Sequence, residues 1–215
     1  MSNPPSVTFS PGPRADLVLA AVAAALYNVW PLGFWLDPSA LDGTYVSVLE
    51  VPGHPYAHLF MACDLATGIT AALAGLALHR RHALAGVGFV IFGLGTIAEG
   101  AIPIAPDCAE SVASCGINLG QVIAPHDIAS IAAALSLAIS VLAVRRHTRW
   151  MPYLAAFWIA AGLFLVASIV VERFTMASQA TFLVACGLAL VAVPVAVRAQ
   201  DQVVALSPEH TPCRT

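Results

Sequence analysis

The stretch WMPYLAAFWIAAGLFLVASIVV, residues 150–171, decides the fold class of this chain. It is 22 residues long and contains no charged side chain. The hydrocarbon core of a bilayer is roughly 30 Å thick, and an α-helix needs about 20 apolar residues to cross it. The stretch therefore predicts a transmembrane helix.

Five further apolar runs of similar length surround it, so we expect six spans in all. They are Leu17–Leu36, Tyr56–Leu78, Ala83–Ile104, Ile128–Val144, Trp150–Val171 and Met176–Val197. Hydrophobic residues make up 59% of the 215-residue chain and charged residues only 10%, against roughly 45–50% and about 25% in soluble domains. A water-soluble enzyme, a nucleic-acid binder and a disordered chain all fit this composition poorly. The sequence predicts an all-α, polytopic membrane protein with six transmembrane helices.

The arginines indicate how the chain is oriented. The chain has no lysine, and all arginines except Arg173 fall in the segments that share a side with the N-terminus. Positive residues concentrate on the cytoplasmic side of membrane proteins, so we expect both termini to be cytoplasmic. We expect residues 1–14 and 199–215 to be disordered and residues 15–198 to form the transmembrane domain. The alternative for the first span is a cleaved signal peptide.

Polar residues cluster at the extracytoplasmic ends of the predicted spans. They are His58, Asp64, Glu99, His126, Asp127 and Glu172. An ionisable residue inside a membrane span is costly and is by default a candidate for function. Asp64 lies deepest, so its carboxyl must be paired, protonated or exposed to a wet cavity.

Two kinds of hydrolytic site are compatible with these residues. In one, His58, Asp64, Asp107 and His126 bind a metal ion, with zinc as a candidate, that activates water. In the other, Ser130 acts as a nucleophile with a histidine base. His126 and Asp64 are the acid/base or ligand candidates of such a site, and Asp127 would orient them. The structural alternatives stay open: Asp127 as a first-turn residue at a helix N-terminus, and His126 as a histidine at headgroup level. The sequence contains no motif with the tight spacing of a known hydrolase.

Cys108 and Cys115 fall in the second outer loop, where disulfides persist, and we expect them to be bridged. A metal-binding pair is the alternative. Haem is not expected: His58 and His79 bracket one span, as His126 and His147 bracket another, and about 31 Å separates the members of each pair along a helix.

Two segments resemble the domain of unknown function 998 family. The first runs from Tyr45 to Glu50, continues with Pro52-Gly53-His54-Pro55 and ends with Phe60 through Asp64. The second is Ile102-Pro103-Ile104-Ala105-Pro106-Asp107-Cys108, followed by Cys115 and His126. The resemblance implies a bacterial six-helix protein of the cytoplasmic membrane, of a kind common in actinobacteria. A fainter similarity to eukaryotic lipid-remodelling and autophagy-modulator proteins implies a role related to lipids.

The expected function is contact with a lipid or small amphiphile at the outer leaflet, as a binding or accessory protein. One alternative is a membrane-embedded lipid hydrolase or remodelling enzyme with an extracytoplasmic His/Asp site, so enzymatic activity stays an open question. A transporter of small solutes is a second alternative. No nucleic-acid partner is expected, and no protein partner is identified.

Overall fold

The computed structural model describes residues 14–42, 45–102, 125–171 and 173–206, and over these ranges every regular element is a helix. The elements are α1 (Ala15–Tyr27), α2 (Trp30–Leu36), the short 3₁₀ helices η1 (Pro38–Asp42) and η2 (Val46–Glu50), α3 (Ala57–His79), α4 (Ala83–Ala101), α5 (Pro125–Val144), α6 (Met151–Val170) and α7 (Thr175–Leu206). The predicted all-α fold is confirmed.

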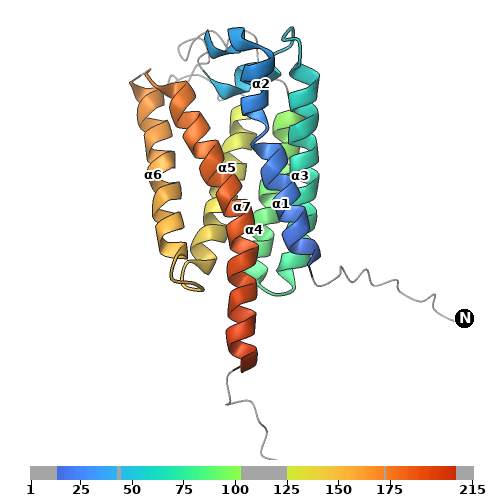
Figure 1. The fold of residues 1–215 in the computed structure, drawn as a ribbon, viewed down its shortest axis with the longest axis vertical. Coiled ribbons are helices and arrows are strands. Elements are labelled where there is room, and N and C mark those ends of the chain that lie inside the picture. Colours follow the sequence, from blue (N-terminus) through green and yellow to red (C-terminus); the bar gives the residue numbers. More distant parts are fainter. Residues whose placement is uncertain (1–13, 43–44, 103–124, 172, 207–215) are drawn as a thin grey trace, which may run out of the picture.

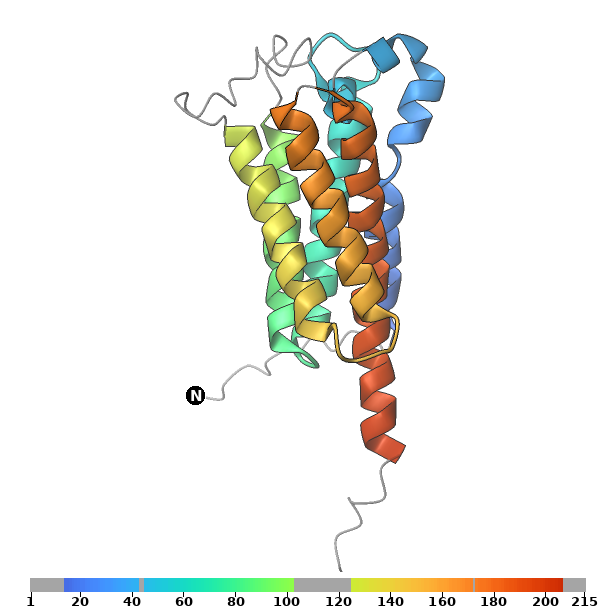
Figure 2. The same ribbon diagram turned by 90° about the vertical axis from the view of Figure 1, so that its left-hand side faces the viewer.

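Six segments are long and apolar enough to cross a membrane, as predicted. They run side by side as one bundle (Figures 1 and 2). Because the number of spans is even, the start of α1 and the end of α7 lie at the same end of the bundle. The second to fifth spans begin and end within a few residues of their expected bounds. The last differs more, because α7 continues past Arg198 through Leu206 and extends beyond the bundle (Figure 2). The first part of the expected disordered tail is therefore helical.

The first predicted span, Leu17–Leu36, is two helices rather than one. The break falls at Asn28 and Val29, between α1 and α2. Pro31 explains it, because proline has no N–H to donate to the carbonyl of Tyr27 one turn earlier. The side chain and the backbone N–H of Asn28 both donate to the Ala24 carbonyl, at 3.1 and 3.2 Å, and so close the end of α1.

The helix α2 and the two 3₁₀ helices that follow it, before the second span begins, are folded over one end of the bundle. We call α2, η1 and η2 together the roof, and that end of the molecule the roof end (Figure 2). Its apolar side chains pack on the bundle in a cluster that also includes Phe60 of α3 and Val51. The roof contributes Ala40, Val46, Val48 and Leu49. The backbone N–H of Val46 donates to the side-chain oxygen of Gln179 on α7, at 2.6 Å. Burial and this hydrogen bond hold the roof in one position.

Small residues let α3 and α4 pack at close range. A Cβ atom added to Gly68 on α3 would lie 2.5 Å from the carbonyl oxygen of Gly93 on α4. Backbone contact of this kind is typical of glycine-rich membrane helices. The glycines therefore allow the backbones of α3 and α4 to approach closely.

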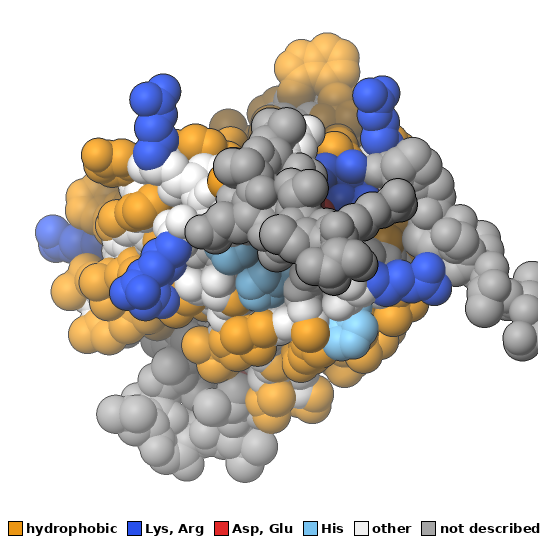
Figure 3. Space-filling view, turned by 90° about the horizontal axis from the view of Figure 1, so that it is seen from below, with side chains coloured by type: hydrophobic (Ala, Val, Ile, Leu, Met, Phe, Trp, Pro, Cys, Tyr) orange, Lys and Arg blue, Asp and Glu red, His pale blue; other side chains and the backbone are white. Residues whose placement is uncertain are grey.

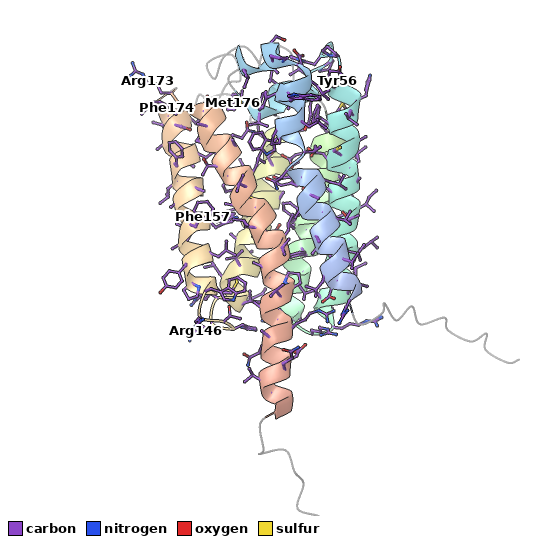
Figure 4. All side chains as sticks on the ribbon, in the orientation of Figure 1. Tyr56, Arg146, Phe157, Arg173, Phe174 and Met176 are labelled. Carbon is purple, nitrogen blue, oxygen red and sulfur yellow. The ribbon has the colours of Figure 1, made fainter. Side chains whose placement is uncertain are left out.

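The opposite end of the bundle carries most of the described arginines, and we call it the arginine end. Their side chains ring the helix ends when the molecule is viewed from that side (Figure 3). Arg146 lies there, whereas Arg173 lies at the roof end (Figure 4). Arg198 on α7 forms an ion pair with the buried Asp16 on α1, which ties the first helix to the last.

A polar cavity beneath the roof

A cavity of about 580 Å³ lies in the roof half of the bundle. Ligand sites for small molecules typically measure roughly 300–1,000 Å³. The roof, α1 and every helix from α3 to α7 contribute to its lining, which combines one polar cluster with a larger apolar surface. The polar cluster consists of Glu50, Asp64, Glu99, His126, Asp127 and Ser130.

Glu50 and Asp64 meet at the top of the cavity, where η2 crosses above α3. Their carboxyl groups are hydrogen-bonded to each other. Carboxylates only accept hydrogen bonds, so one of the two groups must carry a proton. Burial, and then the neighbouring Asp64 carboxyl, raise the pKa of Glu50 well above its usual range. The roof therefore brings a proton-sharing carboxyl into the cavity.

A second polar contact joins α4 and α5. The Ser130 hydroxyl lies between two acceptors, the carboxylate of Glu99 and the backbone carbonyl of His126. It has one proton to donate, so the two acceptors compete for it. Ser130 therefore contacts Glu99 rather than the imidazole of His126 in this arrangement, and its action with a histidine base stays a prediction.

His126 is held by the end of the neighbouring helix. Its Nδ1 lies 2.8 Å from the carbonyl oxygen of Ile102, the residue that caps α4. A carbonyl can only accept, so Nδ1 carries the proton and Nε2 is left as the nitrogen able to accept one. The contact fixes the orientation of the ring and joins the start of α5 to the end of α4.

The predicted site residues thus divide into two groups. Asp64, His126, Asp127 and Ser130 all line the cavity, whereas His58 is exposed on α3 and does not. Among the described residues, no group of three His, Cys, Asp or Glu side chains is placed to hold a metal ion. Asp107, Glu172, Cys108 and Cys115 lie outside the described residues. The predicted four-ligand zinc site and the disulfide therefore stay predictions, and His58 lies apart from the zinc candidates that line the cavity.

Two residues of the site, Glu50 and Gln179, were not predicted from the sequence. Glu50 was noted only as part of the family resemblance, although a lone carboxylate among Val46, Val48, Leu49 and Val51 in a loop is itself a signal of a buried acid. Gln179, which lines the cavity and supports the roof, was not considered. A glutamine in the first turns of an apolar span is the corresponding signal, since polar side chains in membrane helices face the protein interior.

The rest of the cavity is mainly apolar, with Gln179 and Ser47 as exceptions, and its apolar walls come mainly from α5, α6 and α7. Trp158 on α6 packs against Phe182 on α7 with their ring centroids 5.2 Å apart, and both side chains line the cavity. Toward the arginine end lies a core that includes the fully buried side chains of Phe89, Phe92, Leu137 and Leu190. Beside that core, the described buried polar side chains include Ser136 and Ser140, whose hydroxyls donate to backbone carbonyls.

The resulting shape is an apolar chamber with hydrogen-bonding and acidic groups at its roof end. The described residues that line it include no arginine. No protein-family model matches the chain, and neither a curated protein nor a solved structure has a significant match to it, so the resemblance to the domain of unknown function 998 family stays a prediction.

Proposed function

We propose that this protein binds an amphiphile in the cavity, with the apolar part of the ligand against α5, α6 and α7 and its polar group at the acidic cluster. The observation that carries the proposal is the division of the 580 Å³ cavity into a polar end and an apolar remainder. Sites for small molecules have this character, with a few convergent polar groups in a mostly apolar wall. The ligand's polar group would donate hydrogen bonds or carry positive charge, because acids predominate at this end of the cavity.

The position of the cavity in the membrane follows from the arginines. We propose that the arginine end faces the cytoplasm, in accord with the positive-inside rule, and that the protein belongs to a bacterial cytoplasmic membrane, as the family resemblance implies. The cavity would then lie in the outer leaflet, and the roof would be extracytoplasmic. A binding or accessory role is favoured over transport, because among the described residues the core toward the arginine end is mainly apolar, and the buried hydroxyls of Ser136 and Ser140 there donate to backbone carbonyls.

Mass spectrometry of the intact protein in detergent would test this proposal. Gly162 lines the cavity, and a Cβ atom added there would meet only Phe182, at 3.6 Å, so Gly162→Phe directs a ring into the cavity without a backbone clash. Ala160→Phe is the matched control, because Ala160 is exposed on the same helix and is not part of the cavity lining. We expect wild type and Ala160→Phe to retain a bound amphiphile and Gly162→Phe to lose it. Equal retention in all three proteins would reject the proposal.

A hydrolase is the second candidate, and the Ser130–Glu99 contact is the observation that favours it. A carboxylate that accepts the hydroxyl proton can activate a serine for attack on an ester carbonyl. Incubation with a lipid ester should then release fatty acid with wild type but not with Ser130→Ala. If both proteins are inactive while amphiphile binding persists, the binding role remains and the hydrolase is rejected.

A further inference from the structure

The wall of the cavity is thin between α5 and α6. Four of its lining residues also leave half or more of their surface exposed: Ile131 (50%) and Leu135 (60%) on α5, and Leu163 (65%) and Val166 (60%) on α6. Each of these side chains therefore lies at the edge of the cavity rather than deep inside the bundle. In a membrane-spanning segment, the medium on the outer side of such an edge is lipid.

The arrangement of the two helices accounts for this thin wall. A short turn joins α5 and α6 at the arginine end, and toward the roof end the two helices move apart (Figure 1). α6 packs mainly on α7 and only sparsely on α5. α5 and α6 are thus close together at the arginine end, where the turn connects them, and loosely packed in the roof half, where the cavity lies.

The described residues close the cavity toward the roof and toward the arginine end. On the roof side, η2 covers the cavity, with Val46 and Leu49 buried against the bundle and the Val46 N–H bonded to Gln179. Toward the arginine end, the cavity stops at the buried core. Among the described residues, the most exposed side chains of the cavity lining all lie on α5 and α6, so we take this side as the opening.

We propose that the ligand is a lipid of the surrounding bilayer, and that its acyl chain passes into the cavity sideways between α5 and α6. This inference rests on the proposed amphiphile binding and adds the source of the ligand and its route. The acyl chain would lie against Trp158 and Leu163, while the headgroup reaches the polar cluster from the outer leaflet. A water-soluble amphiphile would instead have to pass the roof.

Quenching of Trp158 fluorescence would test the route. A protein with Trp158 as its sole tryptophan, made by changing Trp30, Trp35 and Trp150 to Phe, is reconstituted in phosphatidylcholine vesicles. Some of the phosphatidylcholine carries bromine atoms in the middle of its acyl chains, and acrylamide is the quencher added from water. We expect brominated lipid to quench Trp158 and acrylamide to have little effect. Adding Gly162→Phe should remove most of the quenching by lipid, and Ala160→Phe should leave it unchanged.

Two results would overturn lateral access. Strong quenching by acrylamide with little by brominated lipid would mean that the cavity opens to water. Equal quenching by lipid in the Gly162→Phe and Ala160→Phe proteins would mean that bromine reaches Trp158 from outside the bundle. In either case the intact-mass comparison decides separately whether an amphiphile is bound, so lateral access can fail while amphiphile binding stands.

Discussion

Glu50 and Asp64 depend on a shared proton, and this makes the roof sensitive to pH. The pKa of Glu50 is raised in the folded protein by burial and then by Asp64. A glutamate whose pKa is raised by folding stabilises the folded protein while it is protonated. This stabilisation is complete below the ordinary glutamate pKa of about 4.3 and is lost as the pH rises through the raised pKa. We therefore expect the roof to loosen as the pH is taken from neutral to alkaline. Hydrogen exchange of the η2 amides, corrected for intrinsic exchange rates, would measure this.

The control for that prediction is Glu50→Gln. An amide N–H can donate to the Asp64 carboxylate but does not titrate, so exchange in η2 should become nearly independent of pH. If η2 in Glu50→Gln loosened with pH as much as in wild type, the proton shared by Glu50 and Asp64 would not be what holds the roof.

A second prediction at the residue scale compares two ion pairs made by α7. Asp16 accepts from Arg198 with both carboxylate oxygens, and its side chain is 4% exposed. The pair of Arg81 with Asp201 has side chains 34% and 47% exposed. Removing one partner of a buried pair costs about 3–5 kcal/mol, whereas an exposed pair contributes about 0–1 kcal/mol. The midpoint temperature of thermal unfolding, measured in one detergent, should thus fall clearly in Asp16→Asn and hardly change in Asp201→Asn. Equal effects would show that burial does not distinguish the pairs.

At the scale of the element, the contact between α3 and α4 depends on the absence of side chains. Gly68→Ala would place its Cβ atom 2.5 Å from a backbone oxygen of Gly93, so the helices must separate. Overpacking of this kind costs about 1–3 kcal/mol. Gly162→Ala is the control, since its nearest new neighbour is the Phe182 ring at 3.6 Å; there, helix propensity predicts a gain of about 0.4–1 kcal/mol. Unfolding measurements that ranked the two variants in the opposite order would contradict this account.

The elements themselves were largely predictable, with two instructive exceptions. Length and hydropathy alone located the six spans, because the bilayer sets both quantities. The break between α1 and α2 was missed because apolar composition hides it, although Pro31 marks its position. The roof is not apparent from the sequence, because the stretch between the first two spans is rich in Pro, Gly and Asp, which are typical of turns. Its burial depends on Gln179 and other residues far away in sequence, which local patterns do not reveal.

At the scale of the whole molecule, the candidate site was only partly predictable. A polar residue stands out in an apolar run, so Asp64, His126, Asp127 and Ser130 were identified, and all of them line the cavity. Their partners were not predictable, because pairing is decided by how helices rotate against one another in the bundle. Thus Ser130 contacts Glu99 from α4, and Asp64 contacts Glu50 from the roof. Polar residues in a membrane sequence therefore indicate the depth of a site more reliably than they indicate which of its side chains are in contact.

The asymmetry of the whole molecule leads to a last prediction, on orientation. All described arginines but Arg173 belong to the arginine end, where they would resist transfer across the membrane. In a protein whose native cysteines are changed to Ser, we introduce Arg173→Cys at the roof end or Arg146→Cys at the arginine end (Figure 4). A maleimide that cannot cross membranes should label Arg173→Cys in intact cells and Arg146→Cys only after lysis. The reverse pattern would place the roof and its cavity on the cytoplasmic side, and the ligand would then have to come from the inner leaflet.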